Sequence, residues 1–119
     1  MNIEEYREFC LSKKGATESF PFGKLPHVLI FKVKGKMFSA TDVEIFDGIS
    51  LKCDPEKIEE IRAKYSAVGT QAYMSKAHWN NVLMDDSIPN EVLKEWIDNS
   101  YDLVVKKLTK KQKEELEVL

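Results

Sequence analysis

The hydrophobic and polar positions at the start of the chain follow the spacing of an amphipathic helix. Asn2 is suited to cap this helix because Glu5 follows three residues later, in a variant of the capping box. The lysines at positions 13 and 14 would fall in the last turn, where they complement the helix dipole, and Gly15 is a natural stop. One face carries the apolar side chains of Ile3, Tyr6, Phe9 and Cys10.

The strongest β-sheet pattern lies in the middle of the chain. Residues 27–33 and 36–41 flank Lys34-Gly35, which predicts a hairpin with a two-residue turn. Lysine suits this turn less well than asparagine because the position needs a positive φ. The predicted pairs are Val33 with Lys36, Phe31 with Phe38, and Leu29 with Ala40. Since directly opposed residues share a face, the hairpin would have an apolar face and a mixed face. The apolar face would carry Leu29, Phe31, Val33, Phe38 and Ala40, and the mixed face Lys32, Met37, Ser39 and Thr41.

Shorter elements surround this hairpin. A short strand is predicted over residues 16–20, before a proline and a glycine. Alternating apolar and polar residues predict a further strand over residues 49–53. Asp54 would then cap a helix that has Pro55 at its first position. Two short strands are expected between residues 69 and 84.

The last third of the chain has helical spacing. A helix is predicted from about Pro89, and Thr109 with Gln112 forms a second capping box that opens a short final helix. The apolar stripe of the longer helix consists of Leu93, Trp96, Ile97, Tyr101, Val104 and Leu108. The order of elements predicts an α+β fold, with residues 1–119 as a single domain. Its helices would pack on a mainly antiparallel sheet in an α/β sandwich.

Composition places the chain among ordinary globular proteins. Its 119 residues are 43% hydrophobic and 32% charged, which suits one domain with its own core. No run approaches the ~18 apolar residues of a membrane helix, and the start lacks the basic and apolar regions of a signal peptide. We therefore expect a cytoplasmic protein without a membrane segment. In that reducing compartment Cys10 and Cys53 are expected as free, buried side chains.

Groups that could perform catalysis or hold a metal are few and scattered. His27, His78 and the two cysteines lack the spacing of metal ligands, and neither thiol is placed beside an oriented imidazole. The acidic pair Asp85-Asp86 precedes a helix, where carboxylates complement the dipole. The five glycines form no phosphate-binding loop. We therefore expect a protein that is not an enzyme, with no catalytic residue, metal or cofactor.

The net charge of −2 conceals an uneven distribution. The stretch from Lys24 to Lys36, with Lys32 and Lys34 between them, holds four lysines and no acid, whereas residues 37–51 hold three acids and no base. Lysines at the tip of a two-stranded ribbon can contact the phosphates of DNA. The same lysines would also keep an exposed hairpin edge soluble and unpaired. Without an arginine they offer no bidentate readout of bases.

Two further stretches combine cations with other polar groups. Lys76, His78, Trp79 and Asn80 lie close together in sequence, a mixture suited to phosphate contact or stacking. A tryptophan in a strand can equally serve as a cover over the sheet. Five lysines at positions 106–113 form a third basic group, but three glutamates follow at once, which is typical of a solvated helical face.

Several short segments, which follow one another in order over nearly the whole chain, form a combination that can be compared with known families. They are Thr17-Glu18-Ser19-Phe20-Pro21-Phe22-Gly23, Gly35-Lys36-Met37-Phe38, Leu51-Lys52-Cys53, Tyr73-Met74-Ser75-Lys76, His78-Trp79, Ile88-Pro89 and Ser100-Tyr101-Asp102-Leu103-Val104. Together these segments resemble the MmcQ/YjbR family.

The resemblance implies a fold similar to the frataxin-like (CyaY-like) fold, in a small cytoplasmic bacterial protein. It also implies DNA binding through a paired-hairpin, or double-wing, surface. In this sequence the wings would be the hairpin at residues 32–36 and the region at residues 76–81. A fold similar to that of frataxin does not imply iron binding, because proteins with the same fold can have unrelated functions.

The leading hypothesis is a non-enzymatic protein that binds double-stranded DNA weakly and with little sequence preference. The predicted nucleic-acid-binding residues are Lys24, Lys32, Lys34, Lys36, Lys76, His78 and Asn80. The alternative is a protein–protein interaction module with no nucleic-acid role, which would use the exposed side of the hairpin and the aromatics near Trp79. That alternative predicts an apolar patch of roughly several hundred Å² outside the core.

Overall fold

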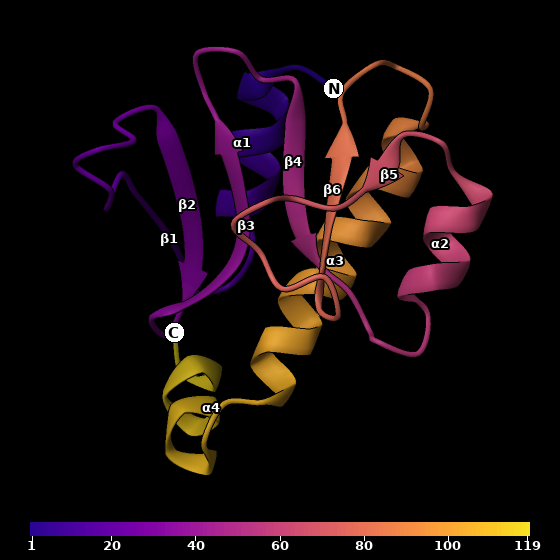
Figure 1. Cartoon of the computed structure of the whole chain (residues 1–119). Coiled ribbons are helices and arrows are strands. Elements are labelled where there is room, and N and C mark those ends of the chain that lie inside the picture. Colours follow the sequence, from indigo (N-terminus) through magenta and orange to yellow (C-terminus); the bar gives the residue numbers. More distant parts are fainter.

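The hairpin predicted around Lys34-Gly35 forms two strands of a six-stranded sheet. The computed structural model describes residues 1–119. The strands are β1 (Ala16–Ser19), β2 (Val28–Val33), β3 (Lys36–Asp42), β4 (Gly48–Lys52), β5 (Val68–Gly69) and β6 (Trp79–Leu83). They lie in the order β1-β2-β3-β4-β6-β5, and every neighbouring pair is antiparallel (Figure 1).

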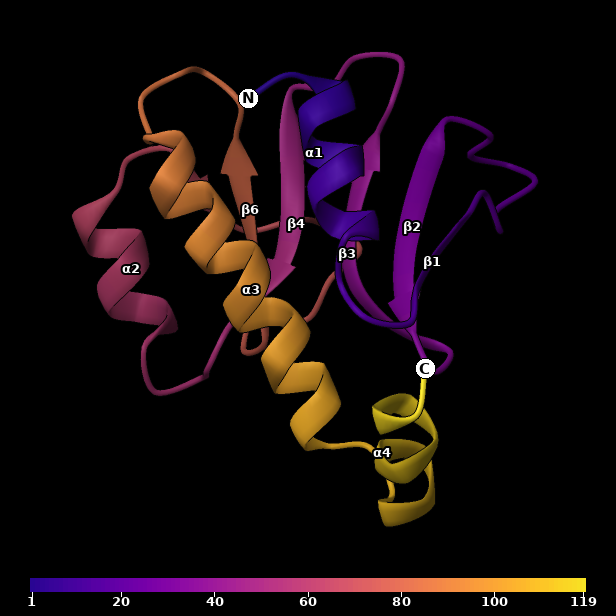
Figure 2. The ribbon, with the colours of Figure 1, turned by 180° about the vertical axis from the view of Figure 1, so that it is seen from behind.

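Four helices complete the fold, and they confirm the predicted α+β class. They are α1 (Ile3–Leu11), α2 (Ile58–Lys64), α3 (Asn90–Lys106) and α4 (Lys110–Glu117). Seen from behind, α1 and α3 lie across the same face of the sheet, and α3 packs on β3 and β4 (Figure 2). Helix α2 packs beside the short edge strand β5, and α4 lies beyond the hairpin end of the sheet. No helix has the length and apolar character needed to cross a membrane.

The ends of the helices follow local sequence signals, with two differences. Both predicted capping boxes are present, at the starts of α1 and α4. Helix α1 ends at Leu11, so the two lysines expected in its last turn lie beyond it. Helix α2 begins at Ile58 rather than at Pro55. The reason is that the Asp54 carboxylate accepts the backbone N–H of Glu56 at 2.9 Å, which holds residues 54–57 in a turn.

A β-bulge at Phe38 changes the predicted register of the hairpin. Val33 pairs with Lys36 as predicted, but Phe31 pairs with Ser39 instead of Phe38. One extra residue on β3 therefore stands opposite β2. Because side chains alternate along a strand, a shift of one residue turns the rest of β3 over.

The shift reverses the predicted facing of Ser39, Ala40 and Thr41. Ser39 is buried on the helix side, where it donates to the carbonyl of Ser50 at 3.0 Å. Its only proton is used there, so the Tyr6 hydroxyl donates to Ser39 Oγ at 2.7 Å. Thr41 also lies on the helix side and donates to a carbonyl of β4 at 2.7 Å. Ala40 faces the other way, so the predicted apolar face was wrong for these three residues.

Ser100 of α3 bonds the backbone where the bulge interrupts the pairing of β3 with β4. Its hydroxyl donates to the carbonyl of Phe38 at 2.5 Å and accepts the N–H of Lys52 at 2.8 Å. The regular pairing of the two strands stops one residue short of these groups. Ser100 is fully buried, so without it both backbone groups would lack a partner in the interior. This contact places α3 across the middle of the sheet.

One apolar core lies between the sheet and the helices α1 and α3. It contains 17 buried residues, contributed by α1, α3, α4, the strands β2 to β6 and the connections beside them. At its centre Tyr6 packs edge-on against Phe31, with ring centroids 5.4 Å apart. Helix α2 contributes least, because its buried Ile58 lies outside this cluster and Ile61 is only partly buried against it.

The side of the sheet that faces away from α1 and α3 carries no helix, and we call it the open face. Its middle is formed by Ile30, Ala40 and Ser50, which are paired with one another and buried. Residues 70–78, which connect β5 to β6, cross in front of β4 toward β3 (Figure 1). The region predicted as two short strands is therefore a two-residue β5, an irregular crossing segment and β6.

Candidate nucleic-acid interface

The tip of the β2–β3 hairpin adopts the predicted two-residue turn. Lys34 and Gly35 have φ angles of 49° and 77°. Two successive positive φ angles belong to the type I′ turn, whose twist matches that of the paired strands. Glycine takes this conformation without steric cost, whereas lysine is strained in it. The Lys34 ammonium lies 3.6 Å from the carboxylate of Glu115 on α4, so part of its charge is balanced within the chain.

Lys32 and Lys76 belong to the open face. Lys32 pairs with Thr17 on β1 and with Met37 on β3, and alternation along β2 places it on the same side as Ile30. Lys76 is exposed in the segment that crosses this face. Neither lysine forms an ion pair within the chain. Their charges are therefore available to an anion.

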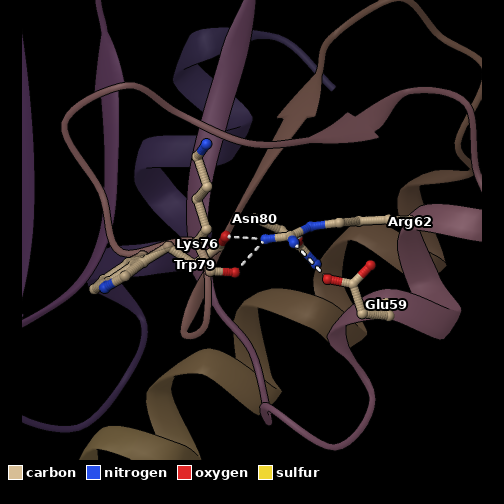
Figure 3. A network of polar contacts seen from close by, with 5 residues as sticks. All are labelled: Glu59, Arg62, Lys76, Trp79 and Asn80. Atoms are coloured by element: carbon tan, nitrogen blue, oxygen red, sulfur yellow. Dashed lines mark hydrogen bonds and ion pairs between the residues drawn. The ribbon is translucent and has the colours of Figure 1, made fainter.

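Arg62 of α2 fastens the end of the crossing segment to the sheet. Its guanidinium donates to the carbonyl oxygens of Lys76 at 2.6 Å and Trp79 at 3.0 Å. It also donates to Oδ1 of Asn80 at 2.8 Å, while Glu59 holds it from one turn earlier in α2 (Figure 3). Several donors fixed in one plane are what an arginine supplies and a lysine does not. The backbone that carries Lys76 is thus held while its side chain remains exposed.

The prediction for Asn80 is corrected by the structure. Asn80 is only 4% exposed and pairs with Leu51, on the side of the sheet that faces the helices. Its amide oxygen accepts a hydrogen bond from Arg62, which also bonds the carbonyl of Lys76 in the crossing segment. Asn80 therefore helps to position Arg62 and does not reach the open face. His78 is half-buried, and its carbonyl accepts the N–H of Cys53 at 2.8 Å. The neighbouring Trp79 is also half-buried.

A second group of lysines gathers at the hairpin end of the sheet. Burial and the positive charges of Lys107 and Lys36 lower the pKa of Lys52. None of the three forms an ion pair. Only Lys36 was predicted as a site residue, because Lys52 and Lys107 are far from it in sequence. The signal that could have found Lys52 is its place at the end of β4, which antiparallel pairing brings to the same end of the sheet as the hairpin tip.

Lys24 lies apart from the other predicted lysines. It belongs to the exposed connection before β2, whereas Lys34 follows β2. A strand of six residues spans roughly 20 Å, so these two lysines lie toward opposite ends of the sheet. Next to that connection, Nε2 of His27 lies 2.7 Å from the carboxylate of Glu44. The four lysines that are close in sequence therefore do not form one patch.

The cysteines and Asp85 are the other groups whose pKa values shift and that sequence analysis considered for catalysis, and their shifts have local structural causes. Both cysteines are free; burial raises the pKa of Cys10 to about 12 and also raises the pKa of Cys53. The Asp85 carboxylate accepts the hydroxyl proton of Ser87 at 2.6 Å, and the hydrogen bonds from Ser87 lower its pKa. No group of three or more His, Cys, Asp or Glu side chains is arranged to hold a metal ion.

These features define a class: a small α+β domain with helices on one face of an antiparallel sheet and a lysine-bearing hairpin at its end. The crystal structure of Deinococcus radiodurans protein DR2400, described with a DUF419 domain, is similar to this chain in fold. It is 35% identical, covers 98% of this chain and 88% of its own, and has a TM-score of 0.89. A crystal structure of a Pseudomonas syringae protein, 22% identical, shares the fold with a TM-score of 0.74 over 87% of this chain and 98% of its own.

Sequence comparison identifies the family. The family model described as YjbR matches residues 11–103. The chain is 31% identical over 119 residues to Uncharacterized protein YjbR of Escherichia coli K12, covering 95% of each. It is 32% identical over 93 residues to Uncharacterized protein YbdF of Escherichia coli O157:H7, covering 77% of this chain and 75% of that one. This protein therefore belongs to the YjbR family, which confirms the resemblance seen in its sequence.

Proposed function

We propose that this YjbR-family protein is a cytoplasmic, non-enzymatic protein that binds double-stranded DNA weakly through phosphate contacts. The observation that carries the proposal is the set of lysines without ion pairs on the open face and at the hairpin end, namely Lys32, Lys36 and Lys76. Lys34 at the tip and His78 at the end of the crossing segment would add polar contacts. Phosphate contacts of this kind carry no sequence information.

The conformation of Lys34 supports a role for the hairpin tip. A lysine with a φ of 49° is strained where an asparagine would fit. Strained residues cluster at functional sites because the rest of the fold can hold them there. A cation at this position is therefore kept at some cost to stability, and contact with phosphate would explain its presence.

The distribution of charge limits the affinity. The whole chain has a net charge of −2, so only the local lysines attract DNA, and acids elsewhere repel it. Lys24 lies toward the other end of the sheet and would touch the same duplex only if the duplex ran along β2. Asn80 is removed from the predicted set because it is buried.

A salt titration of binding to a duplex of mixed sequence tests this proposal. Four contacts, from Lys32, Lys34, Lys36 and Lys76, should give a log–log slope of about −4. Replacing Lys32, Lys36 and Lys76 together by Ala should bring the slope to about −1.

The matched control removes three exposed lysines of α4, Lys110, Lys111 and Lys113, and changes the net charge equally. This variant should keep the slope of the unmodified protein. Absence of binding at 50 mM salt, or equal losses in the two variants, would refute the proposed surface.

A protein partner is the second candidate, because apolar side chains are exposed in the connection between β1 and β2. Phe20 is 53% exposed, Phe22 47% and Leu25 46%. Apolar groups exposed together in one connection are typical of interaction sites. The sequence predicts an exposed apolar patch elsewhere, on the hairpin and at the aromatics near Trp79. Trp79 itself is half-buried.

One pair of variants distinguishes DNA binding from binding of a protein partner. If a protein partner is the function, Phe20→Ser with Phe22→Ser should abolish recovery of one stoichiometric protein from nuclease-treated extract. The lysine triple variant should leave that recovery unchanged. If no such protein is recovered at any salt concentration, this second candidate fails.

A further inference from the structure

A pocket of about 270 Å³ lies between the helices α2 and α3 and the strands β4 and β6. It is on the helix side of the sheet and is therefore separate from the open face. It exists because α2 packs on β5 at the edge and contributes little to the core. At roughly 30 Å³ for each water, the space would hold about nine waters, close to the size of a small bicyclic molecule.

The inner walls of the pocket are apolar. Leu51 and Val82 line it from the sheet, and Trp96 lines it from α3. The Trp96 indole is fixed by an edge-to-face contact with Tyr65, with ring centroids 5.0 Å apart. Ile61 and Leu103 complete the apolar surface. A fixed indole beside aliphatic side chains favours a flat apolar body, since aromatic rings pack in offset or edge-on arrangements.

The residues around the pocket carry an excess of positive charge. Three lysines line it, namely Lys52 at the end of β4, Lys57 in the turn before α2 and Lys106 at the end of α3. None of them forms an ion pair. Of the two carboxylates in the lining, Asp54 already accepts a backbone N–H. The second, Asp102, is exposed on α3. An anion bound beside these three lysines would balance the excess of positive charge in the lining.

One side-chain donor in the lining has no partner within the protein. Asn80 is only 4% exposed and lines the pocket. Because Arg62 donates to Oδ1 of Asn80 at 2.8 Å, the Nδ2 group is left as the free end of the amide. No protein acceptor bonds to that Nδ2, so it is free to donate to an acceptor atom on a ligand.

We propose that this pocket binds a small, flat aromatic anion. Its ring would lie against Trp96, Leu51 and Val82, with its acidic group among Lys52, Lys57 and Lys106. A second acceptor atom would receive the N–H of Asn80. This binding does not depend on DNA binding, since it uses the opposite side of the sheet.

The probe for this site is 2-naphthoate, with neutral 2-naphthamide as its uncharged counterpart. Calorimetry should show one site for 2-naphthoate and at least tenfold weaker binding of 2-naphthamide. In heteronuclear NMR the side-chain amide signals of Asn80 and Asn99, which both line the pocket, should shift with the same dissociation constant.

Two double variants test whether the lysines that line the pocket are needed to bind the carboxylate of 2-naphthoate. Lys57→Gln with Lys106→Gln should weaken 2-naphthoate binding at least tenfold, because both lysines line the pocket and both are exposed, so the fold is retained. Lys110→Gln with Lys111→Gln on α4 changes the net charge equally and should alter binding by less than twofold. Absence of amide shifts at millimolar 2-naphthoate, equal binding of 2-naphthamide, or equal losses in both variants would overturn the proposal.

Discussion

At the scale of single residues, Ser100 shows how a small side chain holds an irregular strand to a helix. It bonds the carbonyl of Phe38 and the N–H of Lys52, two groups at the interrupted end of the β3–β4 pairing. A hydroxyl has one donor and two acceptor positions, so one residue can satisfy both groups. Alanine can satisfy neither.

Replacing Ser100 by Ala should therefore reduce the free energy of unfolding by about 2–3 kcal/mol, because buried polar groups lose their partners. Urea denaturation at pH 7 measures the loss. Ser66→Ala, at an exposed position without a side-chain hydrogen bond, serves as the control and should change stability by less than about 0.5 kcal/mol. A loss at Ser100 below about 1 kcal/mol would mean that water or a backbone shift replaces the hydroxyl.

The buried thiol of Cys10 should make the free energy of unfolding fall as the pH rises into the alkaline range. Burial raises the pKa of its thiol from 9.0 to about 12 in the folded chain. Between these two values the unfolded chain releases the proton first, so stability present below pH 9 is lost as the pH rises. The slope should be about 1.4 kcal/mol per pH unit. Urea denaturation of the unmodified protein and of Cys10→Ala from pH 8 to 11 isolates this contribution. The difference in stability between the two should shrink above pH 9; a constant difference would contradict the buried thiol.

At the scale of elements, the β2–β3 hairpin shows a conflict between turn geometry and charge. Lys34 occupies the first position of a type I′ turn, where asparagine is preferred. Its ion pair with Glu115 is 3.6 Å long and partly exposed, and such pairs contribute little to stability. The turn chemistry therefore dominates the stability of this element.

We expect Lys34→Asn to raise the free energy of unfolding by about 0.5–1 kcal/mol, because asparagine tolerates the positive φ. Thermal or urea denaturation measures the gain. Lys36→Asn removes the same charge from a strand position and should not stabilise the protein. If Lys34→Asn is less stable than the unmodified chain, the contact between the hairpin and α4 outweighs the strain of the turn.

At the scale of the whole molecule, one core joins the sheet to three of the four helices. Its buried residues come from both ends of the chain, from Tyr6 on α1 to Leu116 on α4. A core shared in this way favours unfolding in a single cooperative step. The two tryptophans report on different sides of this arrangement, since Trp79 begins β6 and Trp96 lies in α3.

In Trp79→Phe and in Trp96→Phe, the remaining tryptophan should therefore follow the same urea transition as the far-UV circular dichroism of that variant. Coincident transitions from different probes are the test of two-state unfolding. An earlier fluorescence transition in Trp79→Phe alone would show that the region around Trp96 and α2 opens separately from the sheet.

Much of the fold could be predicted because its signals are local. The capping boxes, the two-residue turn and the α+β order depend on residues that are close in sequence. The register of β3 could not be predicted, because the bulge at Phe38 depends on contacts with β4 and α3 that lie far along the chain. Of the candidate site, Lys24 lies apart and Asn80 is buried. The residues that remain as predicted contacts are Lys32, Lys34, Lys36, Lys76 and His78.

The sequence by itself determined the capping boxes that open α1 and α4, where the hairpin turns and that basic groups outnumber acids near it. Each of these depends on interactions between near neighbours. Only the tertiary structure decided that Lys24 stands apart, that Lys36 gathers with Lys52 and Lys107, and that a pocket opens beside Trp96. The physical reason is that strand pairing and helix packing bring together side chains whose separation along the chain carries no sign of their contact.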